Sequence, residues 1–240
     1  ANKISQLEAK IQQLIKEKNS AEEEVSRLKS FLFALKEKVT DIQFLDFDDY
    51  EEESEIGSGA TSSVKIVSKK SHEKFAKKEL KEFDHKSFQR FLKEGEILFK
   101  LRHPCIVRIY GINYGDQQHR PSIFLSLEPN SLENAIIKKI LNEAQKNRIT
   151  VEIVLGMRFI HSCNFMHRDL KPLNILLSKN LHARISDFGL AKEEDVSISQ
   201  SKGVGTLRFM APEIFEENDK GISYTNKVDV YSFGITLIFI

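Results

Sequence analysis

Polar residues in the second half of the sequence have the types and order needed to align phosphate groups and metal ions. They fall in three segments, which are His167-Arg168-Asp169-Leu170-Lys171-Pro172-Leu173-Asn174, Asp187-Phe188-Gly189 and Ala211-Pro212-Glu213. A carboxylate such as Asp169 can accept or orient a hydroxyl proton, whereas Asn174 and Asp187 offer oxygen ligands suited to Mg²⁺. Phosphoryl transfer mainly requires alignment and charge neutralisation, and these segments supply groups for both.

A glycine turn nearer the N-terminus could hold the phosphates themselves. It lies in Ile56-Gly57-Ser58-Gly59-Ala60-Thr61-Ser62-Ser63-Val64, between two predicted strands. Glycine has no Cβ, so backbone N–H groups near Gly57 and Gly59 can approach a phosphate closely. Glycine turns between strands are common, and this one becomes informative only together with the other motifs.

A lysine on the following predicted strand completes the candidate phosphate site. It is the last residue of Phe75-Ala76-Lys77-Lys78, and Glu94 projects from the helix predicted next. An ion pair between Lys78 and Glu94 would hold the ammonium group at the α- and β-phosphates. Because side chains alternate along a strand, Lys77 is expected on the opposite face, in solvent.

These motifs together are the signature of protein kinases, and residues 50–240 resemble the eukaryotic protein kinase domain. The segments 205–210 (Gly-Thr-Leu-Arg-Phe-Met) and 229–234 (Asp-Val-Tyr-Ser-Phe-Gly) are similar to the tyrosine-kinase-like group of serine/threonine kinases. The resemblance implies an α+β, bilobal fold, with a small β-sheet N-lobe over 46–127 and a helical C-lobe over 128–240. It also implies ATP and Mg²⁺ as cofactors and proteins as substrates.

The resemblance favours serine or threonine as the acceptor. Tyrosine-specific relatives usually lack a lysine at the place of Lys171, which can reach the γ-phosphate. Thr206 matches the threonine that contacts Asp169 and Lys171 in serine/threonine kinases. His167 is expected to be packed, without a role in proton transfer. The expected catalytic residues are Lys78, Glu94, Asp169, Lys171 and Thr206, and the expected metal ligands are Asn174 and Asp187.

The resemblance also implies an adenine pocket, in which Val64, Ala76 and Leu176 sandwich the ring. The connector 127–132 is shorter than usual for the family and is expected to bind adenine through its backbone near Glu128 and Asn130. The expected nucleotide site comprises Ile56, Gly57, Ser58, Gly59, Val64, Ala76, Lys78, Glu128, Asn130 and Leu176. Ser62 stands where the third loop glycine is usual. A stack of Leu98, Ile109, His167 and Phe188 is expected to join the lobes.

Arg168 is a candidate regulatory residue, because a guanidinium beside the catalytic loop can bind a phosphate group. The segment between Asp187 and Glu213 contains serines that could carry such a phosphate, namely Ser197, Ser199 and Ser201. Phosphorylation of one of them is expected to order this segment, with Lys192 or Lys202 assisting Arg168.

Periodicity predicts the elements that must position these residues. Strand, glycine turn and strand are predicted over 55–67, with further strands over 75–80, 106–112 and 123–127. One amphipathic helix is predicted over 87–102, and mainly helix from Ser131 to the His167 region. The family normally continues beyond the helix around Asp229, called helix F. We therefore expect the C-lobe to be truncated at Ile240, with Glu213 lacking its arginine partner.

The N-terminal segment carries apolar residues at nearly every a and d position of a heptad that starts at Ile4 and ends at Ile42, with Lys18 the exception. This period of 3.5 residues predicts a coiled-coil helix, and we assign residues 1–45 to it. Self-association through this helix is one expectation. Packing of the helix on its own kinase lobe is the other.

Composition excludes several classes of partner. Thirty-six basic and thirty-five acidic residues among 240 give a formal charge of +1, so no global field favours nucleic acid or an anionic membrane. Two cysteines are too few for a disulfide scaffold, which fits a cytoplasmic location. The longest nearly apolar run, 231–240, is interrupted by Ser232, Gly234 and Thr236, so no membrane span is expected.

Two other functions fit parts of the sequence. One is a pseudokinase scaffold that binds nucleotide without turnover, and the other is a coiled-coil interaction protein with a globular tail. The presence of Lys78, Glu94, Asp169, Asn174 and Asp187 in the expected order favours an enzyme instead.

Overall fold

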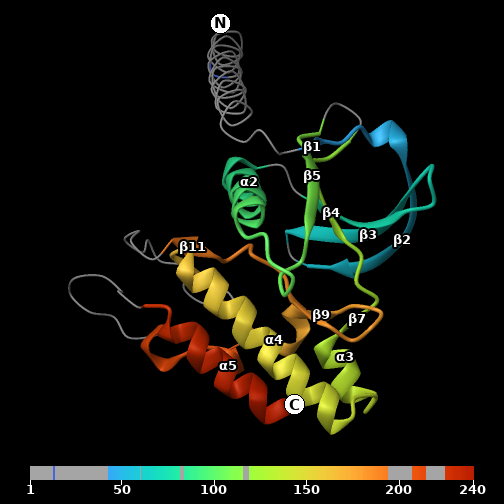
Figure 1. Cartoon of the computed structure of the whole chain (residues 1–240). Coiled ribbons are helices and arrows are strands. Elements are labelled where there is room, and N and C mark those ends of the chain that lie inside the picture. Colours follow the sequence, from blue (N-terminus) through green and yellow to red (C-terminus); the bar gives the residue numbers. More distant parts are fainter. Residues whose placement is uncertain are drawn as a thin grey trace, which may run out of the picture. The chain divides into compact units, whose positions relative to one another are not determined.

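The computed structural model describes residues 13, 43–59, 61–81, 84–115, 119–193, 207–214 and 225–240. The heptad segment 4–42 of the predicted coiled coil lies outside the described residues, apart from the helical Gln13, and so stays a prediction. From Gln43 onward, a β-sheet lobe is followed by a lobe built mainly of helices (Figure 1). This arrangement agrees with the expected bilobal kinase fold.

The sheet lobe contains six strands in the order β1-β5-β6-β4-β3-β2. They are β1 (Gln43–Phe44), β2 (Tyr50–Ser58), β3 (Ser62–Lys69), β4 (Lys74–Leu80), β5 (Ile109–Asn113) and β6 (Ser122–Ser126). Strand β1 pairs parallel with β5, and all other neighbours are antiparallel. The glycine turn predicted between two strands therefore lies at the tip of the β2–β3 hairpin.

Strand register divides the side chains of the sheet between two faces. Val64 pairs with Lys78, and Ile66 pairs with Ala76, so these side chains share one face because directly opposed residues point the same way. The other face carries Val67, Phe75 and Phe124, which form a buried cluster. Only the first of these faces carries Lys78.

A short N-terminal strap, defined here as residues 43–50, covers this second face. Leu45 and Phe47 belong to the buried cluster, and Tyr50 packs against it. The carbonyl oxygen of Leu45 accepts a hydrogen bond from Asn113 Nδ2 at 2.7 Å, while the short 3₁₀ helix η1 (Phe47–Asp49) follows Asp46 as its N-cap. The sheet thus begins at Gln43, inside the segment assigned above to the coiled coil.

Lys77 does not lie in solvent, which corrects one prediction. Strand alternation turns it away from Lys78 as expected, but the strap covers that face and leaves Lys77 only 4% exposed. Its Nζ pairs with Glu52 at 2.6 Å and Glu79 at 2.8 Å and lies 4.8 Å from the ring centroid of Phe47. Burial is tolerated here because carboxylates surround the charge.

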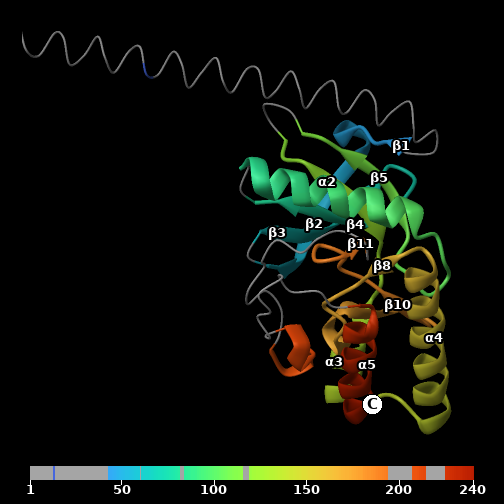
Figure 2. The ribbon, with the colours of Figure 1, turned by 90° about the vertical axis from the view of Figure 1, so that its left-hand side faces the viewer.

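Helix α2 (His85–Lys100) lies across the sheet (Figure 2). It buries Phe88, Phe91, Leu92, Ile97 and Leu98, which form the apolar side of the predicted amphipathic helix. At Gly95 an added Cβ would collide with Ile112 Cδ1 on β5. Any larger residue at this position would require the Ile112 side chain to shift, so glycine suits the close contact between α2 and β5.

The helical lobe follows β6 and contains short strands as well as helices. Its elements are β7 (Asn130–Ser131), α3 (Leu132–Ile137), α4 (Glu143–Ser162), β8 (Phe165–Met166), η2 (Pro172–Asn174), β9 (Ile175–Leu177), β10 (Ala183–Ile185), β11 (Lys192–Glu193), η3 (Leu207–Phe209), η4 (Pro212–Ile214) and α5 (Lys227–Phe239). Helix α4 begins with a capping box between Asn142 and Gln145. Within the described residues, no helix has the length and apolar character needed to cross a membrane.

Backbone hydrogen bonds connect the two lobes. The N–H of Val107 donates to Ile185 O at 2.9 Å, and the N–H of Ile185 donates to Cys105 O at 2.8 Å. These bonds join the segment between α2 and β5 to strand β10. Since Asp187 comes two residues after Ile185, its position relative to the sheet lobe is set by this junction.

Candidate active site

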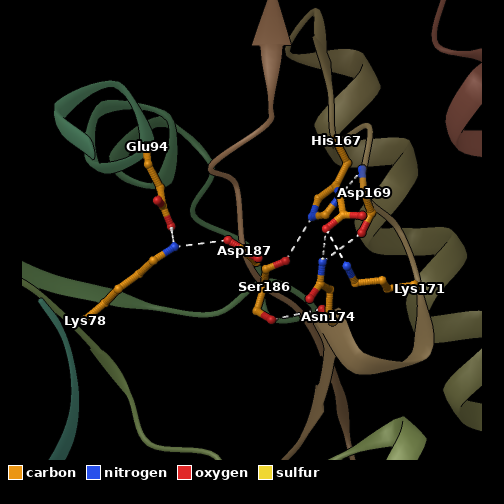
Figure 3. A network of polar contacts seen from close by, with 8 residues as sticks. All are labelled: Lys78, Glu94, His167, Asp169, Lys171, Asn174, Ser186 and Asp187. Carbon is orange, nitrogen blue, oxygen red and sulfur yellow. Dashed lines mark hydrogen bonds and ion pairs between the residues drawn. The ribbon is translucent and has the colours of Figure 1, made fainter. Parts of the chain in front are cut away.

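Lys78 lies between two carboxylates from different elements (Figure 3). Its Nζ is 2.6 Å from Glu94 Oε1 on α2 and 3.0 Å from Asp187 Oδ1 after β10. The side chain of Glu94 is 5% exposed and that of Lys78 13%, whereas that of Asp187 is 48% exposed. The predicted ion pair is present, and Asp187 joins it.

The charges in this group determine how it titrates. Burial disfavours the Lys78 ammonium, but Glu94 and Asp187 outweigh burial and raise its pKa above that of a free lysine. Burial is also the largest influence on Glu94 and, with repulsion from Asp187, raises the pKa of that carboxyl despite Lys78. The charge of Lys78 lowers the pKa of Asp187. At neutral pH the lysine therefore stays charged, with an anionic Asp187 beside it.

A second cluster forms around Asp169, on the loop between β8 and η2. Its Oδ2 accepts hydrogen bonds from Lys171 Nζ and Asn174 Nδ2, both at 2.8 Å. Asn174 Nδ2 also donates to the Asp169 carbonyl oxygen at 2.8 Å. In the described part of the chain no group donates to Oδ1.

His167 is packed beneath this loop. Its Nδ1 accepts the N–H of Asp169 at 3.3 Å, so the proton is placed on Nε2, which donates to Ser186 O at 2.9 Å. The ring meets Phe188 edge-on, with centroids 4.9 Å apart. Both nitrogens are thus occupied by backbone groups. Leu98 and Ile109, the other members of the expected stack, are buried as well.

Asp229 on α5 anchors the same loop, although the sequence interpretation gave it no role. Its Oδ2 accepts the N–H of His167 at 2.8 Å and lies 2.8 Å from His161 Nε2. Its Oδ1 accepts the N–H of Arg168 at 2.7 Å. An acidic residue within a helix that is largely apolar is the sequence signal that could have identified it, because buried charges need partners.

Two residues of the site have left-handed backbone conformations. Arg168 has φ of 66° and Asp187 has φ of 63°, a region that non-glycine residues seldom adopt. Such conformations cost about 1–3 kcal/mol each and persist where surrounding contacts hold them. For Arg168 the contacts include Asp229 and a bond of 2.6 Å from its Nε to Leu190 O.

The expected adenine-binding residues come from both lobes. Val64 and Ala76 share a face of the sheet, and Leu176 lies on β9. Leu125 pairs with Ala76 and so lies on the same face, which makes it a further candidate for the expected adenine pocket that sequence reasoning missed. Identifying it requires the register of β4 against β6, which motif spacing does not provide.

The connector between the lobes is held by the side chain of Glu128. Its Oε1 accepts a hydrogen bond from Ser126 Oγ at 2.9 Å and pairs with Arg184 Nη1 at 3.2 Å. Asn130 forms part of β7, which pairs with β9. The expected backbone contacts of Glu128 and Asn130 with adenine stay predictions.

Several predicted residues lie outside the described part of the chain. They are Thr206, Ser197, Ser199 and Ser201. The expected contacts of Thr206 and the phosphorylation of the three serines therefore remain untested.

In the glycine loop, Ile56, Ser58 and Gly59 are exposed.

The sequence that carries these residues matches a known protein family. The family model for the protein kinase domain matches residues 50–240. The chain belongs to the protein kinase family. This span contains both of the clusters described above, around Lys78 and around Asp169.

Individual members of the kinase family were also compared. A probable serine/threonine-protein kinase of Dictyostelium discoideum is 35% identical over 196 residues, which are 77% of this chain and 31% of the relative. The serine/threonine-protein kinase pakH of the same organism is 31% identical over 191 residues, or 79% of this chain and 36% of the relative. Cold-responsive protein kinase 1 of Arabidopsis thaliana is 30% identical over 203 residues, or 80% and 51%. The matched region thus spans between about a third and a half of these relatives.

The kinase family implies ATP and Mg²⁺, and the residues present fit them. Mg²⁺ is usually bound by one or two protein oxygens together with substrate phosphates and water. Asp187 provides a half-exposed carboxylate, and Asn174 uses its Nδ2 for Asp169, which leaves its amide oxygen for a cation. In the described ranges no group of three or more His, Cys, Asp or Glu residues is arranged to hold a metal ion.

Proposed function

We propose that this kinase transfers the γ-phosphate of Mg-ATP to serine or threonine hydroxyl groups of proteins. The observation that carries the proposal is the pair of hydrogen bonds from Lys171 and Asn174 to Asp169 Oδ2. They orient the carboxylate and leave Oδ1 for the acceptor. Lys171, at the position where tyrosine-specific relatives usually lack lysine, favours an aliphatic hydroxyl.

The described residues can be assigned to steps of the transfer. Lys78, held by Glu94, would position the α- and β-phosphates, and Asn174 and Asp187 would hold the Mg²⁺ that neutralises phosphate charge. Asp169 would accept the hydroxyl proton as the acceptor oxygen bonds to the γ-phosphorus and the bond to the β-phosphate oxygen breaks. Lys171 would stabilise the negative charge on the transferred group. The products are ADP and a phosphorylated protein.

The test is transfer of labelled γ-phosphate from Mg-ATP to three peptides that differ only in carrying Ser, Thr or Tyr. We expect the wild-type chain to label the Ser or Thr peptide. Asp169→Asn should reduce labelling by at least about a hundredfold, a typical contribution of a general base. Asp49→Asn, the same change at an exposed carboxyl, is the control. Equal labelling by wild type and Asp169→Asn would contradict the proposal and favour the scaffold alternative.

Finer features of the predicted function rest on the sequence. We propose membership of the tyrosine-kinase-like group, a cytoplasmic location and self-association through the heptads of residues 4–42. Tethering two kinase domains raises their effective concentration and so favours phosphorylation in trans. The candidate acceptors are Ser197, Ser199 and Ser201, with Arg168 as the residue that would bind the phosphate.

These regulatory proposals are tested by two changes. Removal of residues 1–42 should lower autophosphorylation in dilute solution while activity toward a peptide substrate persists. Replacement of all three serines by alanine should lower activity. Unchanged activity after the triple replacement would exclude these serines as the regulatory site.

A further inference from the structure

A lysine directly after β4 contacts the tip of the glycine loop. Lys81, the residue after this strand, donates from Nζ to Ser58 Oγ at 2.6 Å and to Gly59 O at 2.7 Å. Its backbone N–H donates to Thr61 O at 2.9 Å. One residue therefore binds both arms of the loop, before and after its turn.

The loop has few other internal restraints. Regular pairing between β2 and β3 ends at Ser58 and Ser63. Beyond this pair, in the described part of the tip, Gly59 N–H donates to Ser62 O at 2.8 Å. The bond from Lys81 Nζ to the Gly59 carbonyl oxygen is a further restraint on the described part of the turn. Lys81 thus orients backbone groups at the turn where phosphates are expected to bind.

Strand β4 places this contact in a fixed relation to the catalytic lysine. Lys78 and Lys81 are three residues apart, and the end of the strand is secured by a hydrogen bond of 3.0 Å from Leu80 N to Pro121 O. The loop tip and the Lys78 ammonium are consequently attached to the same rigid element. A displacement of the loop relative to Lys78 is therefore opposed by the Lys81 bonds.

The charge of Lys81 has a second consequence. Within the described residues no carboxylate lies at ion-pair distance from its Nζ, and its partners are a hydroxyl and a carbonyl. Its positive charge is therefore available to attract an anionic ligand at the loop. Lys74, at the other end of β4, differs in this respect, because it pairs with Glu53 at 2.6 Å.

We propose that Lys81 is a positioning residue that holds the glycine loop in the conformation that binds the phosphates of ATP. The inference rests on the proposed function for the identity of the ligand. A preorganised loop pays less conformational entropy on binding. Loss of Lys81 should therefore weaken binding of the triphosphate while leaving binding of the adenine and ribose unchanged.

The test compares dissociation constants of Mg-ATP and of adenosine for the full chain and its variants. Lys81→Met should raise the Kd of Mg-ATP about tenfold, equivalent to about 1.4 kcal/mol, and change that of adenosine less than about twofold. Lys81→Arg retains charge and donors and should restore most of the affinity. Ser58→Ala removes one of the two acceptors and should give a smaller increase. Lys74→Met, the matched control, should bind both ligands like wild type.

The steady-state constants provide the second measurement. Lys81→Met should raise KM for ATP and keep kcat within about threefold of wild type, because no reacting atom is contacted. Wild-type Mg-ATP affinity in Lys81→Met, or equal losses for ATP and adenosine, would overturn the inference. A wild-type chain that binds Mg-ATP but transfers no phosphate would instead overturn the proposed function, and the binding comparison would still test Lys81.

Discussion

Asp229 Oδ1 accepts the backbone N–H of Arg168 at 2.7 Å, across 61 residues of sequence. The other oxygen of this carboxylate binds the N–H of His167 and His161 Nε2. Helix α5 thereby holds the loop that presents Asp169, without contributing an atom to the expected reaction. The left-handed conformation of Arg168 is maintained by the same bond.

Replacing Asp229 by asparagine should destabilise the protein and lower its activity. An amide nitrogen cannot accept the N–H groups that the carboxylate binds, and a buried donor left without a partner costs about 1–3 kcal/mol. We expect a loss of about 2–4 kcal/mol in the free energy of unfolding, since hydrogen bonds to a charged group are the stronger ones. Urea denaturation measures this loss. Asp48→Asn, at an exposed position, should change stability little, and equal stability of the two variants would exclude the anchoring role.

Activity should fall in mild acid before the protein unfolds. Burial raises the pKa of Glu94, so this carboxyl is protonated at a higher pH than a free glutamate, whose pKa is about 4.3. Protonation removes the charge that holds Lys78. A raised pKa in the folded state favours folding as pH falls, and this contribution is lost as pH rises through the folded pKa.

Protonation of Glu94 in acid is therefore expected to break its ion pair with Lys78 without destabilising the fold. Measurement of kcat/KM from pH 8 down to pH 5, with circular dichroism in parallel, should show activity loss while ellipticity is unchanged. Activity that stays constant down to the ordinary range of carboxyl titration would contradict the predicted shift.

Lys171→Met should impair the chemical step. The change removes one of the two donors to Asp169 Oδ2 and the positive charge expected near the γ-phosphate. Loss of one such electrostatic contact typically reduces kcat by about 10²–10³, and KM for ATP should change little. Lys179→Met, at an exposed position, is the control. A change in KM alone would show that Lys171 serves binding rather than transfer.

Leu45→Ala tests whether the strap belongs to the kinase lobe. Leu45 is 8% exposed and lies in the buried cluster, and removal of such a side chain costs about 2–5 kcal/mol. We expect faster hydrogen exchange of the β5 and β6 amides and a lower urea midpoint. Leu28→Ala, at a predicted heptad position, should leave exchange in these strands unchanged. Identical exchange in the two variants would show that the strap does not stabilise the sheet.

The sequence motifs predicted which residues of the candidate site lie together, because each motif combines residue types with a fixed spacing. The contact of Lys78 with Glu94 and the grouping of Asp169 with Asn174 are both present. The order of strands and helices around them also agrees with the periodicities. These features follow from motifs and periodicities, which can be read from a single sequence.

The remaining features depend on tertiary contacts. Strand alternation placed Lys77 on the correct face. The prediction that Lys77 is exposed to solvent was wrong, because the strap covers that face. The role of Asp229 requires α5 to pack beneath the catalytic loop, and the position of Leu125 requires the strand register. No periodicity or motif spacing reports such contacts. The predictions for residues 1–42, Thr206 and the loop serines fall outside the described residues.

The parallel pairing of β1 with β5 also protects the sheet from unwanted association. Strand β5 would otherwise end the sheet, and an edge with free N–H and C=O groups is a template for strands of other molecules. Gln43 and Phe44 occupy part of this edge opposite Gly111 and Ile112. A chain that began after Leu45 would present these backbone groups to solvent. It should therefore aggregate more readily than one that keeps the strap, even where its active site is intact.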